Sequence, residues 1–232
     1  MPNENRALVA NANIGEVIRG ESEYAFGLFG KMGSVLKCPS HVQLCQQNSP
    51  PEHVFVVESG IITVVIGDQD GREYYAGYRT VGWTLGTVSV ITGQPYPASL
   101  VALRASRVRV INARDFMHLL AEDTKLSRYV HNLHSREIYE QMASLSALAL
   151  YPLRKRVEEF LWKILPLVPS IDTKYELPFT DVEMARFLAA TPQHLSQVLR
   201  QLVDEGLIMR SRGWMVVPDR KQLWHRDNDA IR

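Results

Sequence analysis

The stretch Thr180–Arg200 constrains the fold of this chain more than any other. It reads as two short helices joined by a tight turn, because each half begins with a threonine that can cap a helix. Thr180 is followed three residues later by Glu183, a capping-box pattern, and Thr191 is followed by Pro192, which suits a first helical turn. Apolar residues then recur at helical spacing. The pattern predicts a helix-turn-helix, whose second helix enters the major groove of DNA.

The residues that follow make this prediction more specific. Gly206 ends the second helix, and Leu207–Met209 and Trp214–Val217 read as a β-hairpin around the turn Arg210–Gly213. A helix-turn-helix followed by a small hairpin is a winged helix. For the two helices alone, a helical hairpin that only packs a core is the alternative.

Composition sets limits on partners and location. The chain has 232 residues, of which 46% are hydrophobic and 22% charged, as in ordinary globular proteins. Its net charge is +1, so DNA contacts must come from a few placed cations. No apolar run approaches membrane-spanning length, and the N-terminus lacks signal-peptide features. We therefore expect a cytoplasmic protein with no membrane partner.

The first half of the chain has a residue pattern that is typical of β-strands. Two runs of β-branched and aromatic residues, His53–Gly60 and Ile61–Ile66, precede the glycine-bounded turn Gly67–Gly71 and further short strands up to residue 111. Short strands with glycine turns and no intervening helices predict an antiparallel sandwich or jelly roll.

A long helix is predicted next, because residues 124–150 contain neither glycine nor proline. Its later part places four residues at alternating spacings of four and three, which indicates a coiled-coil seam: Ile138, Met142, Leu145 and Ala149. We favour a two-fold dimer through this seam, which would present two recognition helices about one DNA turn apart. Packing of the seam against the chain's own sheet is the alternative.

These parts predict an α+β fold in three segments. Residues 1–112 form an effector-sensing antiparallel β-roll (jelly roll) with an N-terminal extension. Residues 113–150 form a short helix and the long dimerisation helix, and residues 151–232 form the winged helix-turn-helix. Tyr151-Pro152 interrupts the helical pattern between the last two segments and marks the expected hinge.

This order of parts, together with Val54–Val65, Gly82–Gly86 and Glu205–Ile208, resembles the family of the cyclic-AMP receptor protein and the fumarate-nitrate reductase regulator (CRP/FNR). The resemblance runs from about residue 30 to 223. It implies a homodimeric bacterial transcription regulator, not an enzyme, that binds near-palindromic promoter DNA and works with RNA polymerase. It also implies that a small-molecule or redox signal is sensed in the β-roll.

Departures from the family bear on that signal. Cyclic-nucleotide members hold the phosphate with a glutamate and an Arg-Ser pair, and these places are Thr87 and Pro97-Ala98 here, which leaves no arginine to clamp a phosphate. The family's adenine-contacting pair falls on Gln141 and Met142. These departures argue against cyclic AMP and cyclic GMP, and we predict no cofactor.

Other effectors stay open. The N-terminal cysteine cluster of the iron–sulfur branch is absent, and Cys38 and Cys45 form at most a redox-sensing pair, with ordinary thiols as the alternative. His41 and His53, with Pro2, leave haem as an open possibility.

An apolar effector pocket would be lined by aromatic residues of the roll such as Tyr75 and Trp83, beside the departing positions Thr87, Pro97, Ala98, Gln141 and Met142. Ordinary packing of the sheet is the alternative for each aromatic residue. The identity of the effector, and whether one is needed, is left open.

The outward-facing residues of the second helix predict how DNA is read. The family often reads cytosine and guanine there with a glutamate and an arginine, and Gln193 and Gln197 replace them. A glutamine amide can pair with N6 and N7 of adenine. The residues expected to contact DNA are Thr191, Pro192, Gln193, His194, Ser196, Gln197, Arg200, Arg210 and Arg212.

Two rival functions can be stated. A cupin-like metal-dependent enzyme would need clustered histidines and a carboxylate on neighbouring strands, and the roll offers His41 and His53 without a His-x-His pair. A winged helix could also work through protein contacts without reading DNA. We predict no metal ligands and no catalytic residues.

Overall fold

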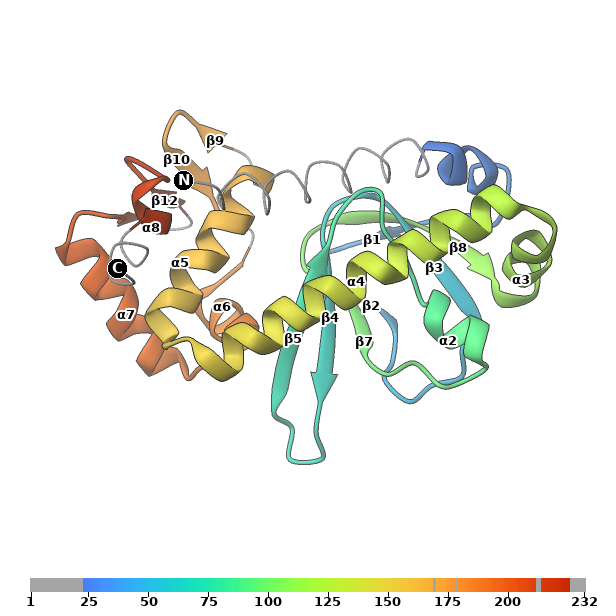
Figure 1. Ribbon diagram of the computed structural model, residues 1–232, viewed down its shortest axis with the longest axis horizontal. Helices are drawn as coiled ribbons and strands as arrows, with labels where there is room; N and C mark the ends of the chain where they lie inside the picture. Colours follow the sequence, from blue (N-terminus) through green and yellow to red (C-terminus); the bar gives the residue numbers. More distant parts are fainter. Residues whose placement is uncertain (1–22, 169, 178, 212–213, 226–232) are drawn as a thin grey trace, which may run out of the picture. The chain divides into compact units, whose positions relative to one another are not determined.

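The computed structural model describes residues 23–168, 170–177, 179–211 and 214–225 (Figure 1). These residues form two compact units. The first extends to Arg72 and resumes at Ala76–Met142, and the second contains Glu73–Tyr75 and the chain from Ala143 onward. In this part of the chain, no helix is both long and apolar enough to cross a membrane.

The first unit is built on two four-stranded sheets, as the predicted antiparallel β-roll requires (Figure 1). One sheet has the order β1 (Ser34–Cys38), β8 (Ser106–Asn112), β3 (His53–Ser59) and β6 (Thr84–Leu85). The other has the order β2 (Gln43–Cys45), β7 (Ser99–Ala102), β4 (Ile62–Gly67) and β5 (Glu73–Arg79). In the first sheet, β3 pairs antiparallel with β8, with Phe55 opposite Val110.

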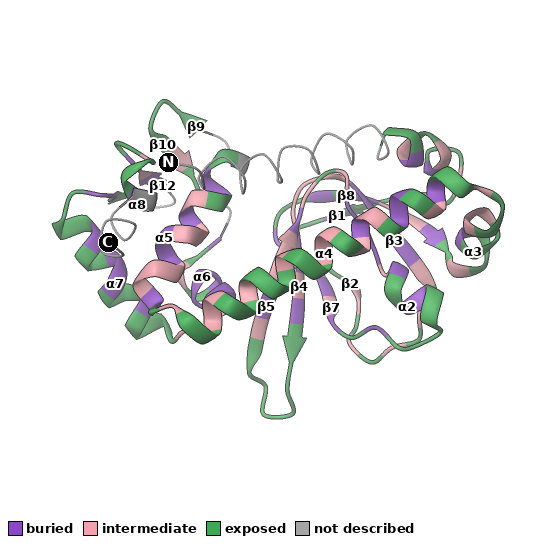
Figure 2. Ribbon diagram, in the orientation of Figure 1, coloured by how far each residue is buried: buried purple, intermediate pink, exposed green. Residues whose placement is uncertain are grey.

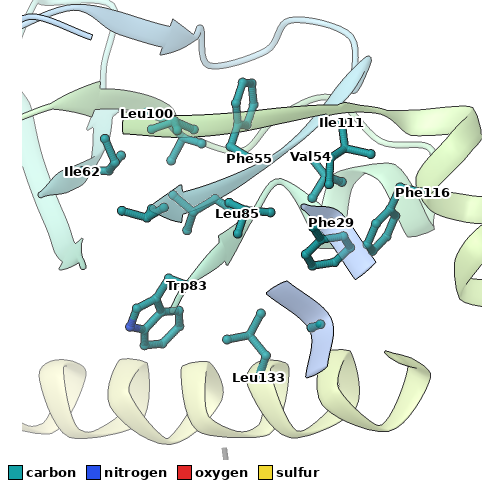
Figure 3. Close-up of a cluster of buried hydrophobic side chains, with 14 of the residues drawn as sticks. Phe29, Val54, Phe55, Ile62, Trp83, Leu85, Leu100, Ile111, Phe116 and Leu133 are labelled. Carbon is teal, nitrogen blue, oxygen red and sulfur yellow. The ribbon is translucent and has the colours of Figure 1, made fainter. Parts of the chain in front are cut away.

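The core of this unit gathers side chains from both sheets and from the helices that pack on them (Figure 3). Four consecutive residues of β3, Val54–Val57, are buried, because α2 (Thr87–Thr92) and α3 (Ala113–Glu122) also contact this strand. A continuous apolar run is typical of a strand that is covered on both faces. Phe29 ends a helix at residues 23–29 and packs against Phe116 of α3. The centroids of the two rings are 6.3 Å apart.

Helix α2 corrects the expectation that no helix interrupts the strands. It has six residues and lies between Gly86 (φ 82°) and Gly93 (φ 67°), both in the left-handed region. A segment this short shows no helical period, and its threonines, valines and isoleucine favour strands in isolation. Its helical form is therefore set by the glycines at its ends and by its contacts with β3 and α3.

The long helix α4 (Thr124–Leu150) has the bounds that the sequence predicts. Asp123 stabilises its start, because the carboxylate accepts hydrogen bonds at 2.9 Å from the backbone N–H groups of Lys125 and Leu126. The first half packs on the roll through Leu126, Tyr129, Val130 and Leu133. The hydroxyl of Tyr129 bonds to Thr84 at 2.8 Å, and burial raises the pKa of Tyr129 to about 12.

The second unit contains the predicted winged helix-turn-helix. Its elements in order are α5 (Leu153–Ile164), the short 3-10 helix η1 (Leu165–Leu167), β9 (Ser170–Ile171), β10 (Lys174–Glu176), α6 (Asp181–Phe187), α7 (Pro192–Asp204), β11 (Met209–Ser211), β12 (Trp214–Val216) and α8 (Gln222–His225). The wing strands β11 and β12 belong to a sheet of order β11-β12-β10-β9. The segment that leads into α6 is thus paired with the wing, with Tyr175 opposite Met215.

Candidate nucleic-acid interface

Side-chain caps fix the start of both helices of the helix-turn-helix. The Thr180 hydroxyl accepts from the backbone N–H of Glu183 at 3.2 Å, and the Glu183 carboxylate accepts from the backbone N–H of Thr180 at 2.7 Å. This confirms the predicted capping box. The Thr191 hydroxyl accepts from the backbone N–H of His194 at 3.2 Å, and Pro192 occupies the first position of α7.

The turn between the helices contains a residue in an unfavourable backbone conformation. Ala189 has a φ of 46°, and the next residue, Ala190, closes the turn by donating its backbone N–H to the carbonyl of Ala185 at 3.0 Å. The left-handed conformation brings Cβ close to a carbonyl oxygen and costs roughly 1–2 kcal/mol for a residue other than glycine.

We expect Ala189→Gly to raise the free energy of unfolding of the second unit by about 0.5–1 kcal/mol, because glycine adopts this conformation without the Cβ clash. Ala189 is exposed, so no buried methyl group is lost. Urea unfolding followed by circular dichroism measures the change. Ala190→Gly is the matched control and should lower stability by about 0.5–1 kcal/mol, because its φ is not positive. A loss of stability in both variants would contradict the strain at Ala189.

Helix α7 has one buried and one exposed face. The buried residues are Leu195, Val198, Leu199 and Leu202. The expected DNA-contacting residues of this helix are all exposed, and five of them line an open hollow of about 420 Å³: Pro192, Gln193, Ser196, Gln197 and Arg200. The two glutamines therefore lie on the same face as the arginine, with their amides accessible to a ligand.

The remaining expected DNA contacts lie in the wing and at the start of α7. Thr191 and His194 are exposed beside the first turn of α7. Arg210 on β11 pairs with Asp181, the first residue of α6, with 2.5 Å between Nη2 and Oδ1. This pair ties the wing to the start of the helix-turn-helix, a role that the sequence did not indicate. Arg212 lies outside the described residues.

Two residues that depart from the family's nucleotide site, Thr87 and Gln141, make hydrogen bonds within the first unit. Thr87 is buried at the first position of α2, and its hydroxyl is 2.8 Å from Nε2 of His134 on α4. Burial lowers the pKa of His134 below the usual value for histidine. Gln141 donates its side-chain amide to the carbonyl of Ala76 at 3.4 Å.

The other expected pocket residues differ in exposure. Ala98 is buried, whereas Pro97 and Met142 are exposed. Tyr75 is buried on β5 and is grouped with the second unit, where its ring centroid lies 5.0 Å from that of Phe187.

Arg79 on β5 is a buried arginine of the roll, at a position that the family's nucleotide site did not point to. Its side chain is 3% exposed, and its Nη2 is 2.8 Å from Oε1 of Glu137 on α4. Its guanidinium carbon lies 4.5 Å from the ring centroid of Trp83, and that of Arg136 lies 4.8 Å from the same ring. Within the described residues, Nε of Arg79 has no hydrogen-bond partner. The burial of a single arginine in a strand cannot be read from the sequence.

The two cysteines lie on different sheets. Cys38 is buried on β1 and Cys45 is half-buried on β2. Burial raises the pKa of both thiols, to about 11 for Cys45, and a protonated thiol is a poor nucleophile. His41 precedes β2 and His53 begins β3, whereas Pro2 lies outside the described residues. Across the described ranges, no three His, Cys, Asp or Glu side chains are grouped to hold a metal ion.

The seam residues of α4 are uncovered in the single chain. Exposed residues recur along the second half of α4 (Figure 2). Ile138, Met142 and Leu145 are 65%, 60% and 61% exposed, and Ala149 is exposed too. In the first unit, Ile138 and Met142 are therefore not covered by the chain's own sheet. The neighbouring Tyr139 and Leu150 are also exposed, so the second half of α4 presents a row of apolar side chains.

Comparison with known proteins agrees with both units. Residues 35–123 match the family model of the cyclic nucleotide-binding domain, and residues 155–226 match that of the Crp-like helix-turn-helix domain. Regulatory protein YeiL of Escherichia coli O157:H7 is 22% identical over 180 residues, which cover 78% of this chain and 79% of that protein. The cAMP-activated global transcriptional regulator CRP of Salmonella typhimurium is 21% identical over 175 residues, covering 74% and 83%.

The fold is also shared with solved structures. FixK2 from Bradyrhizobium japonicum superimposes with a TM-score of 0.74 at 18% identity, over 83% of this chain and 96% of that one. This likeness shows that the arrangement of β-roll, long helix and winged helix-turn-helix is a shared fold. The chain belongs to the CRP/FNR family of transcription regulators and carries that family's helix-turn-helix DNA-binding domain.

Proposed function

We propose that this protein is a homodimer in the cytoplasm that binds near-palindromic promoter DNA, works with RNA polymerase, and is controlled by a small-molecule or redox signal in its β-roll. The observation that carries the proposal is the exposed face of α7. Its first turns present Gln193, Ser196 and Gln197 next to Arg200, with no acidic side chain among them. Such a face can enter the major groove without repelling the phosphates.

The two glutamines define which bases this face would prefer. Each amide has a donor and an acceptor, which match N7 and N6 of adenine. Gln193 and Gln197 are four residues apart and therefore lie on the same side of α7, one above the other. We infer a half-site that contains adenines in place of the G·C pairs that a glutamate and an arginine would read.

Dimerisation is supported by the uncovered seam. An apolar row on a helix of 27 residues is costly in water, and a second copy of the same helix would cover it with a matching row. A two-fold dimer also explains why a chain with a net charge of only +1 could bind DNA specifically, because two interfaces act together.

A small molecule is favoured over a redox signal in the roll. Burial raises the pKa of the thiols of Cys38 and Cys45, which disfavours the thiolate form that oxidants attack. The polar groups around Trp83, by contrast, include a buried guanidinium with a donor that has no partner within the described residues. Such a group can recognise an acceptor on a small molecule.

The test is the base preference of glutamine variants. We expect Gln193→Ala and Gln197→Ala each to reduce the preference for adenine at one half-site position by about 5- to 150-fold, corresponding to the roughly 1–3 kcal/mol of a bidentate base contact. Selection from randomised duplexes, followed by gel-shift titration of the selected sites, measures the change.

Gln201→Ala is the matched control, because Gln201 is an exposed glutamine further along α7 that does not line the hollow. It should leave the selected motif unchanged. An unchanged motif in both test variants would refute the assigned readout. If the unaltered protein selected no two-fold motif and bound duplexes only with a steep salt dependence, the winged helix would act without specific DNA recognition.

A further inference from the structure

The first turn of α5 carries three consecutive cations in a place where helices favour anions. Arg154, Lys155 and Arg156 follow the N-cap residue Pro152, and this turn contains no acidic residue. The partial positive charge of a helix N-terminus repels cations by a few tenths of a kcal/mol to about 1 kcal/mol each. Local helix preference therefore does not account for these cations, so contacts with residues distant in sequence must stabilise them.

Arg154 forms a two-pronged ion pair with the end of the recognition helix. Its Nη1 and Nη2 lie 2.5 and 2.7 Å from Oε1 and Oε2 of Glu205, the C-cap residue of α7. Its Nε donates at 3.0 Å to the buried Glu158 of α5. Glu205 is itself at the unfavourable end of its helix, because a helix C-terminus favours cations. Each partner opposes the dipole of its own helix, and the pair between the helices compensates both.

Arg156 makes a second connection from the same turn of α5. Its Nη1 donates at 2.5 Å to the backbone carbonyl of Leu188, the C-cap residue of α6. One helical turn thus holds the C-terminal ends of both helices of the helix-turn-helix. The two contacts lie 32 and 51 residues away in sequence from the arginines that make them.

We propose that Arg154 is a positioning residue for DNA recognition, which together with Glu205 fixes the direction of α7 on α5. The inference rests on the proposed function as a dimer on a palindrome. Helix α5 follows α4 after Tyr151-Pro152. In a dimer joined through α4, the position of each α5 would therefore determine the distance between the two recognition helices. A rigid connection from α5 to α7 then makes binding depend on the spacing between the half-sites, whereas a loose one tolerates other spacings.

The experiment compares palindromes whose half-sites are separated by the selected spacing or by one base pair more or less. Arg154→Gln and Glu205→Gln should each lower the preference for the selected spacing by roughly three- to ten-fold. Affinity for a single half-site should change little. The two substitutions change the charge in opposite directions, so an effect of the same sign cannot come from attraction to phosphates.

Two further variants separate positioning from charge and from folding. Arg154→Lys keeps the charge but cannot form the two-pronged pair, and it should also lose spacing preference. Lys163→Gln is the matched control, because it removes one charge from α5 at an exposed side chain whose ion pair, at 4.0 Å, is with Glu159 of the same helix. In the double variant of Arg154→Gln and Glu205→Gln, the loss should be no larger than in either single variant.

Thermal unfolding of every variant identifies those that do not fold. If Arg154→Gln does not fold, the spacing preference of Arg154→Lys tests the inference in its place. Unchanged spacing preference in folded Arg154→Lys and Glu205→Gln would overturn the inference, as would effects of opposite sign in Arg154→Gln and Glu205→Gln. If the unaltered protein bound no palindrome, the proposed function would fail and the inference with it. A palindrome bound equally well at all spacings would overturn the inference alone.

Discussion

Leu145→Glu is expected to convert the protein to a monomer and to weaken its binding to a full palindrome by roughly 100-fold or more, the gain that two linked binding sites provide. Leu145 is 61% exposed in the single chain, so the substitution should leave the fold of each unit intact. In a dimer, the seam would bring two glutamates together in an apolar interface, where unpaired charges are strongly unfavourable.

Sedimentation velocity measures the change in mass, and gel-shift titration on a full palindrome and on one half-site measures the change in affinity. Half-site affinity should be almost unchanged, because α7 does not take part in the seam. Ala143→Glu is the matched control: it adds the same charge two residues earlier, at an exposed position outside the spacing of four and three. A dimeric Leu145→Glu protein would place the dimer interface elsewhere.

Phe116→Ala should lower the free energy of unfolding of the first unit by about 3–5 kcal/mol, the usual cost of removing a buried aromatic ring. Phe116 is fully buried on α3 and contacts Phe29 across the core. Because the chain forms two compact units, only one of two calorimetric transitions should move to lower temperature.

The neighbouring residue supplies the control for this prediction. Met117 is on the same helix and is 38% exposed, so Met117→Ala should change the transition by less than about 1 kcal/mol. DNA binding below the lowered transition should be retained, because α7 belongs to the other unit. If both transitions moved together in Phe116→Ala, the two units would unfold as one.

The elements with strong local signals could be predicted from the sequence. Helix α4 was predictable because 27 residues without glycine or proline end at Tyr151-Pro152, and α6 and α7 because their caps are short-range patterns. The exposed face of α7 also followed from helical spacing alone. The two-residue strand β9 and the six-residue helix α2 could not be predicted, because each is too short to show a period and is held by neighbours distant in sequence.

Contacts between distant residues account for most of what the sequence did not show in the candidate site. The pair between Arg210 and Asp181 spans 29 residues, and that between Arg79 and Glu137 spans 58. Arg210 was expected to contact DNA, and only the fold shows that it pairs with Asp181. Arg79 was overlooked because an arginine in a strand is exposed in most proteins. Only the fold decides which charged side chains meet.

The pairing of β10 with β12 makes the helix-turn-helix depend on the wing that follows it in the chain. A chain shortened at the end of α7 would lose β11 and β12, and β10 would become a sheet edge with only the two-residue β9 beside it. The buried side chain of Met215 would be lost with them, and the open edge would invite pairing between molecules. The helix-turn-helix is therefore not a detachable module: the wing is part of what keeps it folded.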